Sequence, residues 1–266
     1  MSQSRQAGKP ALTVEQEPFL IVRSLASQYA SGYRMPEHDH PWRQLLYATT
    51  GAMTVYAGRC TWMVPPGKAV FIPAGCRHAM RMWGEVAMRS LYFPPSLSGP
   101  VMQSGECFVL SVTPLLRELI LRVIELHALD SRAPEHARLA AFLLDELAIA
   151  PLTPLSLPLP LDARALAVAG EVLSAPREGL SLDALARRHG AGRRTLERCF
   201  RTETGMSFGM WRRQARLLHS ISALAQGKAV TEAAFDAGYS SVSAYIAAFK
   251  RTFGATPKQN RDCAGE

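Results

Sequence analysis

The chain has 266 residues, 48% of them apolar, and a net charge of +8. A chain of this length favours two domains over one. No run approaches the roughly 18 consecutive apolar residues of a membrane span, and the first ten residues lack the apolar part of a signal peptide, so we expect a cytoplasmic protein with no membrane partner. Five scattered cysteines, none spaced as CxxC, argue against a disulfide framework or a thiolate zinc site.

Residues 1–15 are polar and unpatterned, and we expect them to be disordered. A first domain is predicted over residues 16–149. From Phe19 to about Pro95, short alternating runs are separated by Gly and Pro, which is typical of a β-sandwich or β-barrel. These runs are LLYATTG, MTVYAG, TWMVPPG, AVFIPAG and VAMRSLYF.

Two histidine-containing segments lie in this β-rich region. HDHPWRQLLYATTG places His38 and His40 two residues apart, on one face of a strand, and Gln44 can share that face. GKAVFIPAGCRH ends at His78. Together the segments resemble the cupins, whose motifs are HxHxxxE followed by glycine, and then GxxxxxPxGxxH. His38, His40 and His78 match the ligand positions, Gly51 and Gly67 match turn positions, Gln44 replaces the usual Glu, and Met82 replaces the final Asn.

The cupin resemblance implies a site for one divalent transition metal of unspecified identity. Three imidazoles suit such an ion, and Gln44 offers a fourth, neutral contact in place of a carboxylate. Alternatively, the histidines make hydrogen bonds or contact an organic ligand. Trp42, Gln44 and Tyr47 are the candidates for contact with that small molecule.

Helical periodicity follows over residues 114–129 and 134–149, which suits a helical hairpin. Residues 150–161, APLTPLSLPLPL, contain four prolines and are predicted to be an extended interdomain linker. Residues 162–266 would then form the second domain. They hold 16 Lys and Arg against 10 Asp and Glu, and so carry most of the net positive charge.

The second domain shows two helix-turn-helix patterns joined by a long helix. In the first, Ser181 caps a helix, a turn follows at residues 189–192, and a second helix runs over about residues 193–203. In the second, Thr231 caps a helix that holds Phe235, a turn follows at residues 237–240, and the next helix runs over about residues 241–253. An apolar stripe between the units predicts one helix of about five turns as a rigid spacer.

Residues 179–261 resemble the DNA-binding domain of the AraC/XylS transcription regulators, above all in TLERCFRTETGMSF and AGYSSVSAYIAAFKRTFGATP. The resemblance implies a sequence-specific regulator bound to double-stranded DNA, with a small-molecule effector in the first domain, pairing of the helical hairpins into a homodimer, and contact with RNA polymerase if it is an activator. The expected fold class is α+β: an N-terminal cupin-like β-barrel with a helical hairpin, and a C-terminal all-α domain with two helix-turn-helix units.

The exposed face of the first unit's second helix is predicted to carry Arg193, Arg194, Glu197, Arg198 and Arg201, which suit phosphates and guanine. The resemblance assigns base contacts to Arg194, Glu197 and Arg198 there. In the second unit it assigns base-facing positions to Val242, Ser243, Ile246 and Ala247, and backbone contacts to Lys250 and Arg251. Gly192 stands where a capping Ser is usual, and Ala247 where Arg is frequent. We therefore expect the first unit to provide most of the sequence discrimination.

Two other hypotheses stay open on the sequence. One is a cupin-type metal-dependent enzyme, such as a dioxygenase or isomerase, with an appended DNA-binding domain; the scarcity of acids in the barrel favours a sensor over an enzyme. The other is redox sensing through Cys60 or Cys76. The run HxHxWxQLxYA also resembles regulators that control a neighbouring exporter gene.

Overall fold

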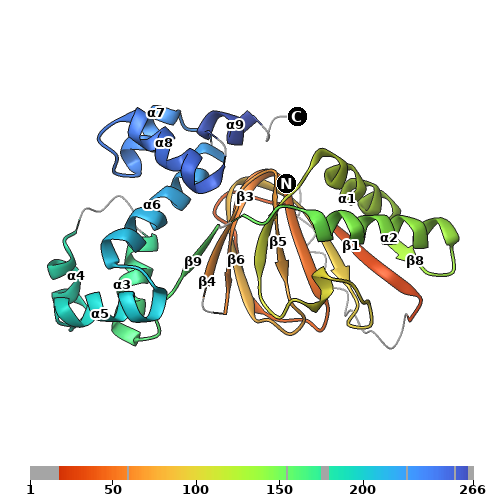
Figure 1. Ribbon diagram of the computed structural model, residues 1–266, viewed down its shortest axis with the longest axis horizontal. Helices are drawn as coiled ribbons and strands as arrows, with labels where there is room; N and C mark the ends of the chain where they lie inside the picture. The colour runs from red at the N-terminus through yellow and green to blue at the C-terminus, as the bar shows by residue number, and fades with distance from the viewer. Residues whose placement is uncertain are drawn as a thin grey trace, which may run out of the picture.

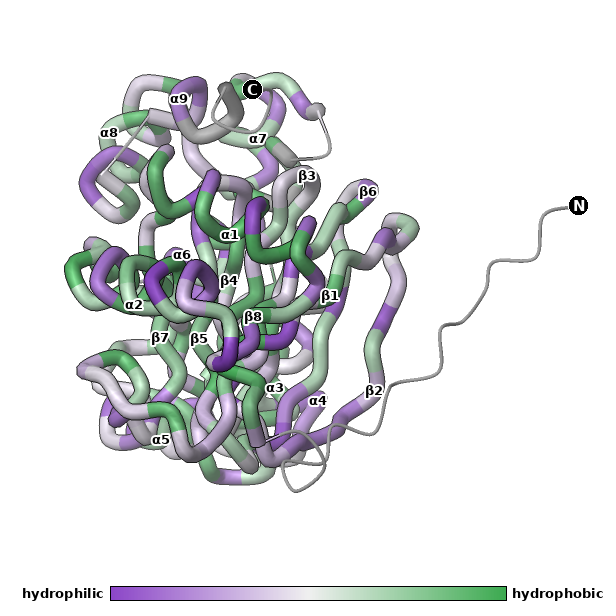
Figure 2. Tube along the Cα trace, turned by 90° about the vertical axis from the view of Figure 1, so that its right-hand side faces the viewer, coloured by the Kyte–Doolittle hydropathy of each residue, from purple (hydrophilic) through white to green (hydrophobic). Residues whose placement is uncertain are grey.

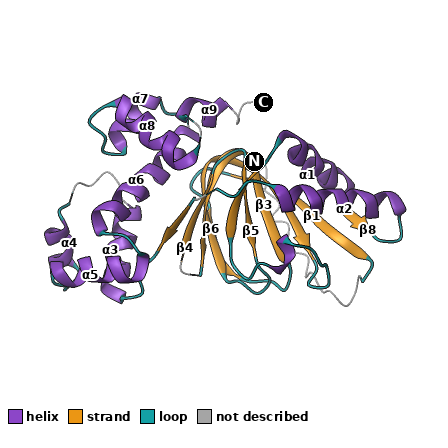
Figure 3. Ribbon diagram, viewed as in Figure 1, coloured by secondary structure: helices purple, strands orange, loops and turns teal. Residues whose placement is uncertain are grey.

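The computed structural model describes residues 18–262 except 59, 154, 175–179, 226 and 255. The disorder expected for residues 1–15 lies outside the described residues. A β-sheet domain comes first and a helical domain second (Figures 1 and 3), so the α+β class is confirmed. No helix in the described part of the chain combines the length and apolar character needed to cross a membrane.

The first domain is a curved antiparallel sheet of nine described strands in the order β7-β5-β3-β6-β1-β8, with β2 paired to β6, and β4 paired to β3 and β9. Its strands are β1 (Leu20–Tyr29), β2 (Arg34–His38), β3 (Arg43–Ala57), β4 (Cys60–Val64), β5 (Lys68–Ile72), β6 (His78–Phe93), β7 (Phe108–Ser111), β8 (Ala128–Asp130) and β9 (Ser156–Pro158), and a short 3-10 helix, η2, covers Val101–Gln103.

The long strands β3 and β6 form the centre of this sheet. The predicted runs LLYATTG and MTVYAG, on either side of Gly51, belong to one strand, β3. The prediction of a turn at Gly51 is therefore wrong. Gly51 lies between Thr50 and Ala52, where the register of β3 on β6 shifts. Its φ is +69°, and a Cβ would lie 2.6 Å from the Glu85 carbonyl oxygen, so the irregularity requires glycine. Gly67, by contrast, lies in a turn, as expected.

Alternation along β3 sends side chains to two separate cores. Leu46 and Ala48 face the inside of the curved sheet, whereas Leu45 and Tyr47 face the opposite side. On that opposite side lie α1 (Pro114–Leu126) and α2 (Pro134–Ile149), the predicted helical hairpin, with β8 between them. Hydrophobic and hydrophilic segments alternate along both helices (Figure 2), since each buries only the face turned to the sheet.

The second domain contains α3 (Ala163–Ser174), α4 (Leu182–Arg188), α5 (Arg193–Thr204), α6 (Phe208–Ala225), α7 (Val230–Asp236), α8 (Val242–Phe253) and α9 (Pro257–Asp262). The predicted spacer helix is α6, and its 18 residues span about 27 Å. The α4–α5 pair and the α7–α8 pair lie at opposite ends of α6 (Figure 1). Helices α3 and α9 were not predicted.

The proline-rich segment 150–161 is extended, yet it is held by both domains. Its strand β9 pairs antiparallel with β4. From the other side, the indole Nε1–H of Trp211 in α6 donates to the Pro158 carbonyl at 2.7 Å, and the Gln214 amide donates to the Ser156 carbonyl at 3.0 Å. The connection between the domains is therefore a bonded strand and differs from the free linker that the prolines suggested.

Helix α6 also packs directly on the sheet. Its His219 ring meets Trp83 of β6 edge-to-face, with centroids 5.4 Å apart. A cavity of about 30 Å³ lies beside this contact, between Thr54, Thr61 and Trp83 of the sheet and Leu218 and His219 of α6. Such a volume suits about one water molecule. One hydrophobic cluster runs from the inside of the sheet into the helical domain.

Candidate functional site

The first helix-turn-helix unit forms as the sequence predicts. The Ser181 hydroxyl accepts the Ala184 N–H at 3.2 Å and caps α4. Helix α5 begins after Gly192, which makes no side-chain cap. It buries Leu196, Cys199 and Phe200, and this packing turns the opposite, basic face outward.

All five predicted contact residues of α5 are exposed: Arg193, Arg194, Glu197, Arg198 and Arg201. They do not have the same surroundings. Arg193 lies 2.9 Å from the Asp183 carboxylate of α4 and 3.7 Å from Glu197. The guanidinium groups of Arg194, Arg198 and Arg201 make no ion pair within the described part of the chain. Arg193 therefore ties α5 to α4, while the other three point charge at the solvent.

The second unit presents a different surface. In α8, Ser243 and Ala247 are exposed, whereas Val242 and Ile246 are half-buried and pack against the core. Lys250 and Arg251 lie exposed in the last turn of α8. They are the charged members of the predicted contact set of this unit. The middle of the outward face of α8 thus offers small and apolar side chains.

One expectation about the second unit is wrong. Helix α7 begins at Val230 after Ala229, with no side-chain cap, so Thr231 lies inside the helix instead of at its start. Helix α7 holds Phe235, as expected, and leaves it 60% exposed while Ala233 and Ala234 are buried. Ser241, in contrast, caps α8 by accepting the Ala244 N–H at 3.2 Å.

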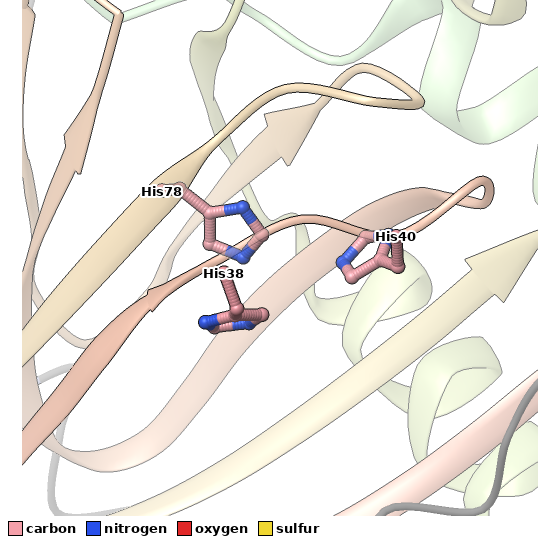
Figure 4. A group of neighbouring side chains, drawn as sticks. All are labelled: His38, His40 and His78. Carbon is pink, nitrogen blue, oxygen red and sulfur yellow. The ribbon is translucent and has the colours of Figure 1, made fainter.

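In the first domain, the structure brings together His38, His40 and His78, named here the histidine site (Figure 4). His38 ends β2, His40 lies in the loop that follows, and His78 begins β6. The expectation that His38 and His40 share a strand face is wrong because β2 stops between them. One donor atom from each ring lies within 4.8 Å of the others, and His78 is fully buried.

The three imidazoles are oriented in the same way. Each Nδ1 lies within hydrogen-bond distance of a main-chain carbonyl two residues away: His38 with Pro36 at 2.9 Å, His40 with Trp42 at 2.7 Å, and His78 with Cys76 at 2.9 Å. A carbonyl only accepts, so each Nδ1 carries the hydrogen, and in the neutral ring each Nε2 then presents a lone pair. Metal-binding histidines are commonly held this way by their second ring nitrogen.

Gln44 joins the site from β3 and is 2% exposed. Its Oε1 lies 2.9 Å from His40 Nε2, and its Nε2 lies 2.9 Å from the Tyr92 hydroxyl. Burial raises the pKa of Tyr92 to about 12, so its hydroxyl stays protonated at neutral pH. Tyr92 was not predicted, although it pairs with Gln44 in the register of β3 and β6, and a correct alignment of the two strands would have found it.

The two aromatic candidates for ligand contact do not both reach the site. The Trp42 carbonyl accepts from His40, and the Trp42 side chain is 1% exposed. Tyr47 lies on the opposite face of β3 from Gln44, in the core beneath α1 and α2. The proposed grouping of Tyr47 with Gln44 is therefore wrong, because residues an odd number apart in a strand face opposite sides.

Acidic side chains near the site lie at its rim. Glu37 is paired with Arg77 at 3.1 Å, and both are mostly exposed. This ion pair joins the neighbours of His38 and His78, and it is worth little in water. The remaining side chains of the site are neutral, so the geometry suits binding of a cation or a polar ligand.

Comparison with known proteins places both domains. A model of the AraC-like ligand binding domain matches residues 21–148, and a model of a helix-turn-helix domain matches residues 185–262. The transcriptional regulator NimR of Escherichia coli K12 is 33% identical over 222 residues, which cover 84% of this chain and 80% of NimR. The regulator RipA of Corynebacterium glutamicum is 38% identical over 100 residues, covering 38% of this chain and 30% of RipA.

Among solved structures, ToxT from Vibrio cholerae with bound unsaturated fatty acid is 12% identical with a TM-score of 0.37, covering 90% of this chain and 94% of ToxT. The two domain matches and the extent of the similarity to NimR confirm the resemblance found in the sequence. The chain belongs to the AraC family of transcriptional regulators, with an N-terminal ligand-binding domain and a C-terminal DNA-binding domain.

Proposed function

We propose that this regulator recognises its DNA chiefly through α5 and responds to a divalent transition metal held by His38, His40 and His78. The observation that carries the metal assignment is the common orientation of the three rings, each with Nδ1 on a main-chain carbonyl. This arrangement fixes the tautomer in advance and leaves three Nε2 atoms as donors.

The contact between His40 and Gln44 supports the same assignment. With Nδ1 protonated, His40 Nε2 and Gln44 Oε1 are two acceptors 2.9 Å apart. Two acceptors this close repel each other unless a cation lies between them. A bound metal ion or a second proton on the His40 ring would remove the repulsion, as would a rotation of the Gln44 amide that exchanges its oxygen and nitrogen. A bound cation would take both atoms as neutral donors, which suits imidazole-binding metals more than Ca²⁺ or Mg²⁺.

The donor atoms require a small closure around an ion. Ligand atoms about 2.1 Å from a tetrahedral metal lie about 3.4 Å apart, whereas the donor atoms here lie within 4.8 Å of one another. His38 and His40 flank the end of β2 and are half-buried, so movement of the segment between β2 and β3 suffices. Metal binding would thereby tighten β2 against the start of β6.

Metal content tests the site directly. Protein purified without chelators is expected to retain about one metal ion per chain, measured by plasma mass spectrometry, and the His38→Ala, His40→Ala double variant is expected to lose it. His127→Asn is a matched control, because His127 is an exposed histidine outside the site whose positive φ asparagine tolerates. Unchanged metal content in the double variant would overturn the metal assignment.

The path from this site to the DNA-binding domain is short. His78 and Trp83 lie on the same strand, β6, and Trp83 contacts His219 of α6. A shift of β6 on metal or effector binding would therefore press on the helix that separates the two helix-turn-helix units. Footprinting on DNA upstream of its own and adjacent genes, with and without Zn²⁺, tests this: an unchanged footprint would contradict the coupling.

Subunit pairing is a further part of the proposal. Leu115 of α1 and Phe142 and Ile149 of α2 are exposed on the side of these helices away from the sheet, and Ile149 is 74% exposed. A homodimer through α1 and α2 would cover them. Phe142→Asp is expected to yield monomers in analytical ultracentrifugation. Leu166→Asp, at an apolar site of similar exposure on α3, should leave the dimer intact.

We propose a sensor rather than a cupin-type enzyme. The two acids next to these histidines in sequence, Glu37 and Asp39, are both exposed, and Glu37 is bound to Arg77, so they are poorly placed for general acid or base work. We further propose that the protein acts in the cytoplasm, contacts RNA polymerase where it activates, and controls a neighbouring exporter gene, the last on the sequence resemblance of residues 38–48. Transcript levels of that gene in a deletion strain test the assignment.

A further inference from the structure

Two cysteines that are far apart in sequence meet beside the histidine site. Cys76 lies in the turn between β5 and β6, and Cys107 directly precedes β7, which pairs with β5. Their Sγ atoms are 3.9 Å apart, and both side chains are half-buried. The sequence pointed to Cys60 or Cys76 as redox candidates and missed Cys107, because the contact depends on the pairing of β5 with β7.

We propose that Cys76 and Cys107 form a reversible disulfide when the protein meets a peroxide. In the first step the Cys76 sulfur takes one oxygen from hydrogen peroxide, giving a sulfenic acid and water. In the second, the Cys107 sulfur displaces that oxygen, which leaves as a second water with the protons of both groups. The two thiols are oxidised by two electrons, and one peroxide is reduced to two waters.

The geometry permits this bond with a local movement. A disulfide has a sulfur–sulfur distance of about 2.05 Å, so the sulfurs must approach by about 1.9 Å. Cys76 lies in a turn and its neighbours Ala74, Gly75 and Arg77 are exposed, so the turn can make this movement without disturbing the core. Burial and the neighbouring Cys76 raise the pKa of the Cys107 thiol, so Cys107 is protonated at neutral pH and loses its proton as it attacks the sulfenic acid.

The same turn positions two of the three imidazoles. The Cys76 carbonyl accepts from His78 Nδ1 at 2.9 Å, and the Gly75 N–H donates to the His40 carbonyl at 2.9 Å. Closing the disulfide pulls on both hydrogen bonds at once. Oxidation would therefore distort the histidine site and lower its affinity for metal. This coupling rests on the proposed metal site, whereas the disulfide itself does not.

Peptide mapping of the full chain tests the disulfide. Trypsin leaves Cys60, Cys76 and Cys107 on separate peptides, 60–68, 69–77 and 90–117. After hydrogen peroxide and alkylation, the non-reduced digest is expected to contain peptide 69–77 joined to 90–117, and dithiothreitol should release them. Cys107→Ser should abolish the joined peptide and Cys60→Ser should retain it. Joining of 69–77 to 60–68, or irreversible oxidation of Cys76 alone, would overturn the proposal.

Cobalt binding tests the coupling. Co²⁺ titrated into the reduced protein is expected to give visible absorption bands, and the oxidised protein should bind it about tenfold or more weakly, as for loss of a partner of a metal-bound histidine. The oxidised Cys107→Ser protein should bind as the reduced wild type does. Equal affinity before and after oxidation would overturn the coupling. A reduced protein that binds no Co²⁺ would overturn both the metal site and the coupling, while the peptide map still decides the disulfide.

Discussion

In the first helix-turn-helix unit, α5 turns Arg194, Arg198 and Arg201 to solvent, whereas α8 of the second turns Ser243 and Ala247 outward and keeps its charge in the last turn. The frameworks are alike, since each helix begins after a turn, buries an aromatic core and ends at a glycine of positive φ, Gly205 or Gly254. Apart from their helix caps, the two units therefore differ mainly in the surface that they expose. Two units of the same geometry can thus differ in role, one reading bases and the other mainly anchoring the DNA backbone.

The largest expected effect tests whether the frameworks are equivalent. Phe200 and Phe249 are both fully buried, and replacing either with Ala should lower the free energy of unfolding by ~3–5 kcal/mol. Urea denaturation of the two variants measures this. If Phe249→Ala lowers the free energy of unfolding far less than Phe200→Ala does, the second unit contributes less to the stability of the fold. The two units would then differ in their cores as well as in their surfaces.

The next effect concerns sequence reading by α5. Arg198→Ala should weaken binding to the cognate site by ~1–3 kcal/mol and relax the preference at one position. Fluorescence anisotropy on the cognate site and on single-base variants measures both. Lys250→Ala is the comparison variant and should weaken binding evenly on all sequences. An even loss in Arg198→Ala as well would reduce Arg198 to a backbone contact.

A substitution that adds a DNA contact to α8 tests the difference between the two units. Ala247 is exposed on α8, so Ala247→Arg should add a contact to base or phosphate and tighten binding. If the new contact is to a phosphate, the slope of log K against log salt should steepen by roughly 0.9. Salt titrations of the wild type and the variant provide the test. No change in affinity or slope would indicate that α8 does not face the DNA at this position.

The smallest effects concern the helix caps. Ser241 caps α8 with its side chain, whereas Gly192 begins α5 without one. Ser241→Ala should cost ~1 kcal/mol of stability, and Gly192→Ser should gain a few tenths of a kcal/mol. Thermal unfolding monitored by circular dichroism compares them. A gain in Gly192→Ser that also weakens DNA binding would show that the glycine serves close approach to DNA.

Much of the helical domain follows from local signals in the sequence. Ser181 and Ser241 mark helix starts, and the apolar stripe predicts α6, because capping and periodicity depend on residues a few positions apart. Thr231 shows the limit of the same reasoning. It is the second residue of α7, and a threonine at that position gives the same local sequence pattern as a threonine that caps the helix. The exposure of Phe235 likewise depends on packing that periodicity does not contain.

The β-domain was predicted less completely because its contacts are non-local. The motifs identified the three histidines, but the pairing of Gln44 with Tyr92 and of Cys76 with Cys107 depends on strand register across 48 and 31 residues. Gly51 was assigned to a turn because glycine is equally suited to a bulge. The docking of β9 on β4 was missed because four prolines in twelve residues indicate extension without indicating a partner.

The placement of β9 has a practical consequence for dissecting the molecule. A ligand-binding domain cut at residue 149 would lose β9 and leave one edge of β4 with unsatisfied main-chain groups. Exposed strand edges promote aggregation. A truncated domain that ends after Pro158 would keep this edge covered, and it is therefore the better starting point for isolating the domain in solution.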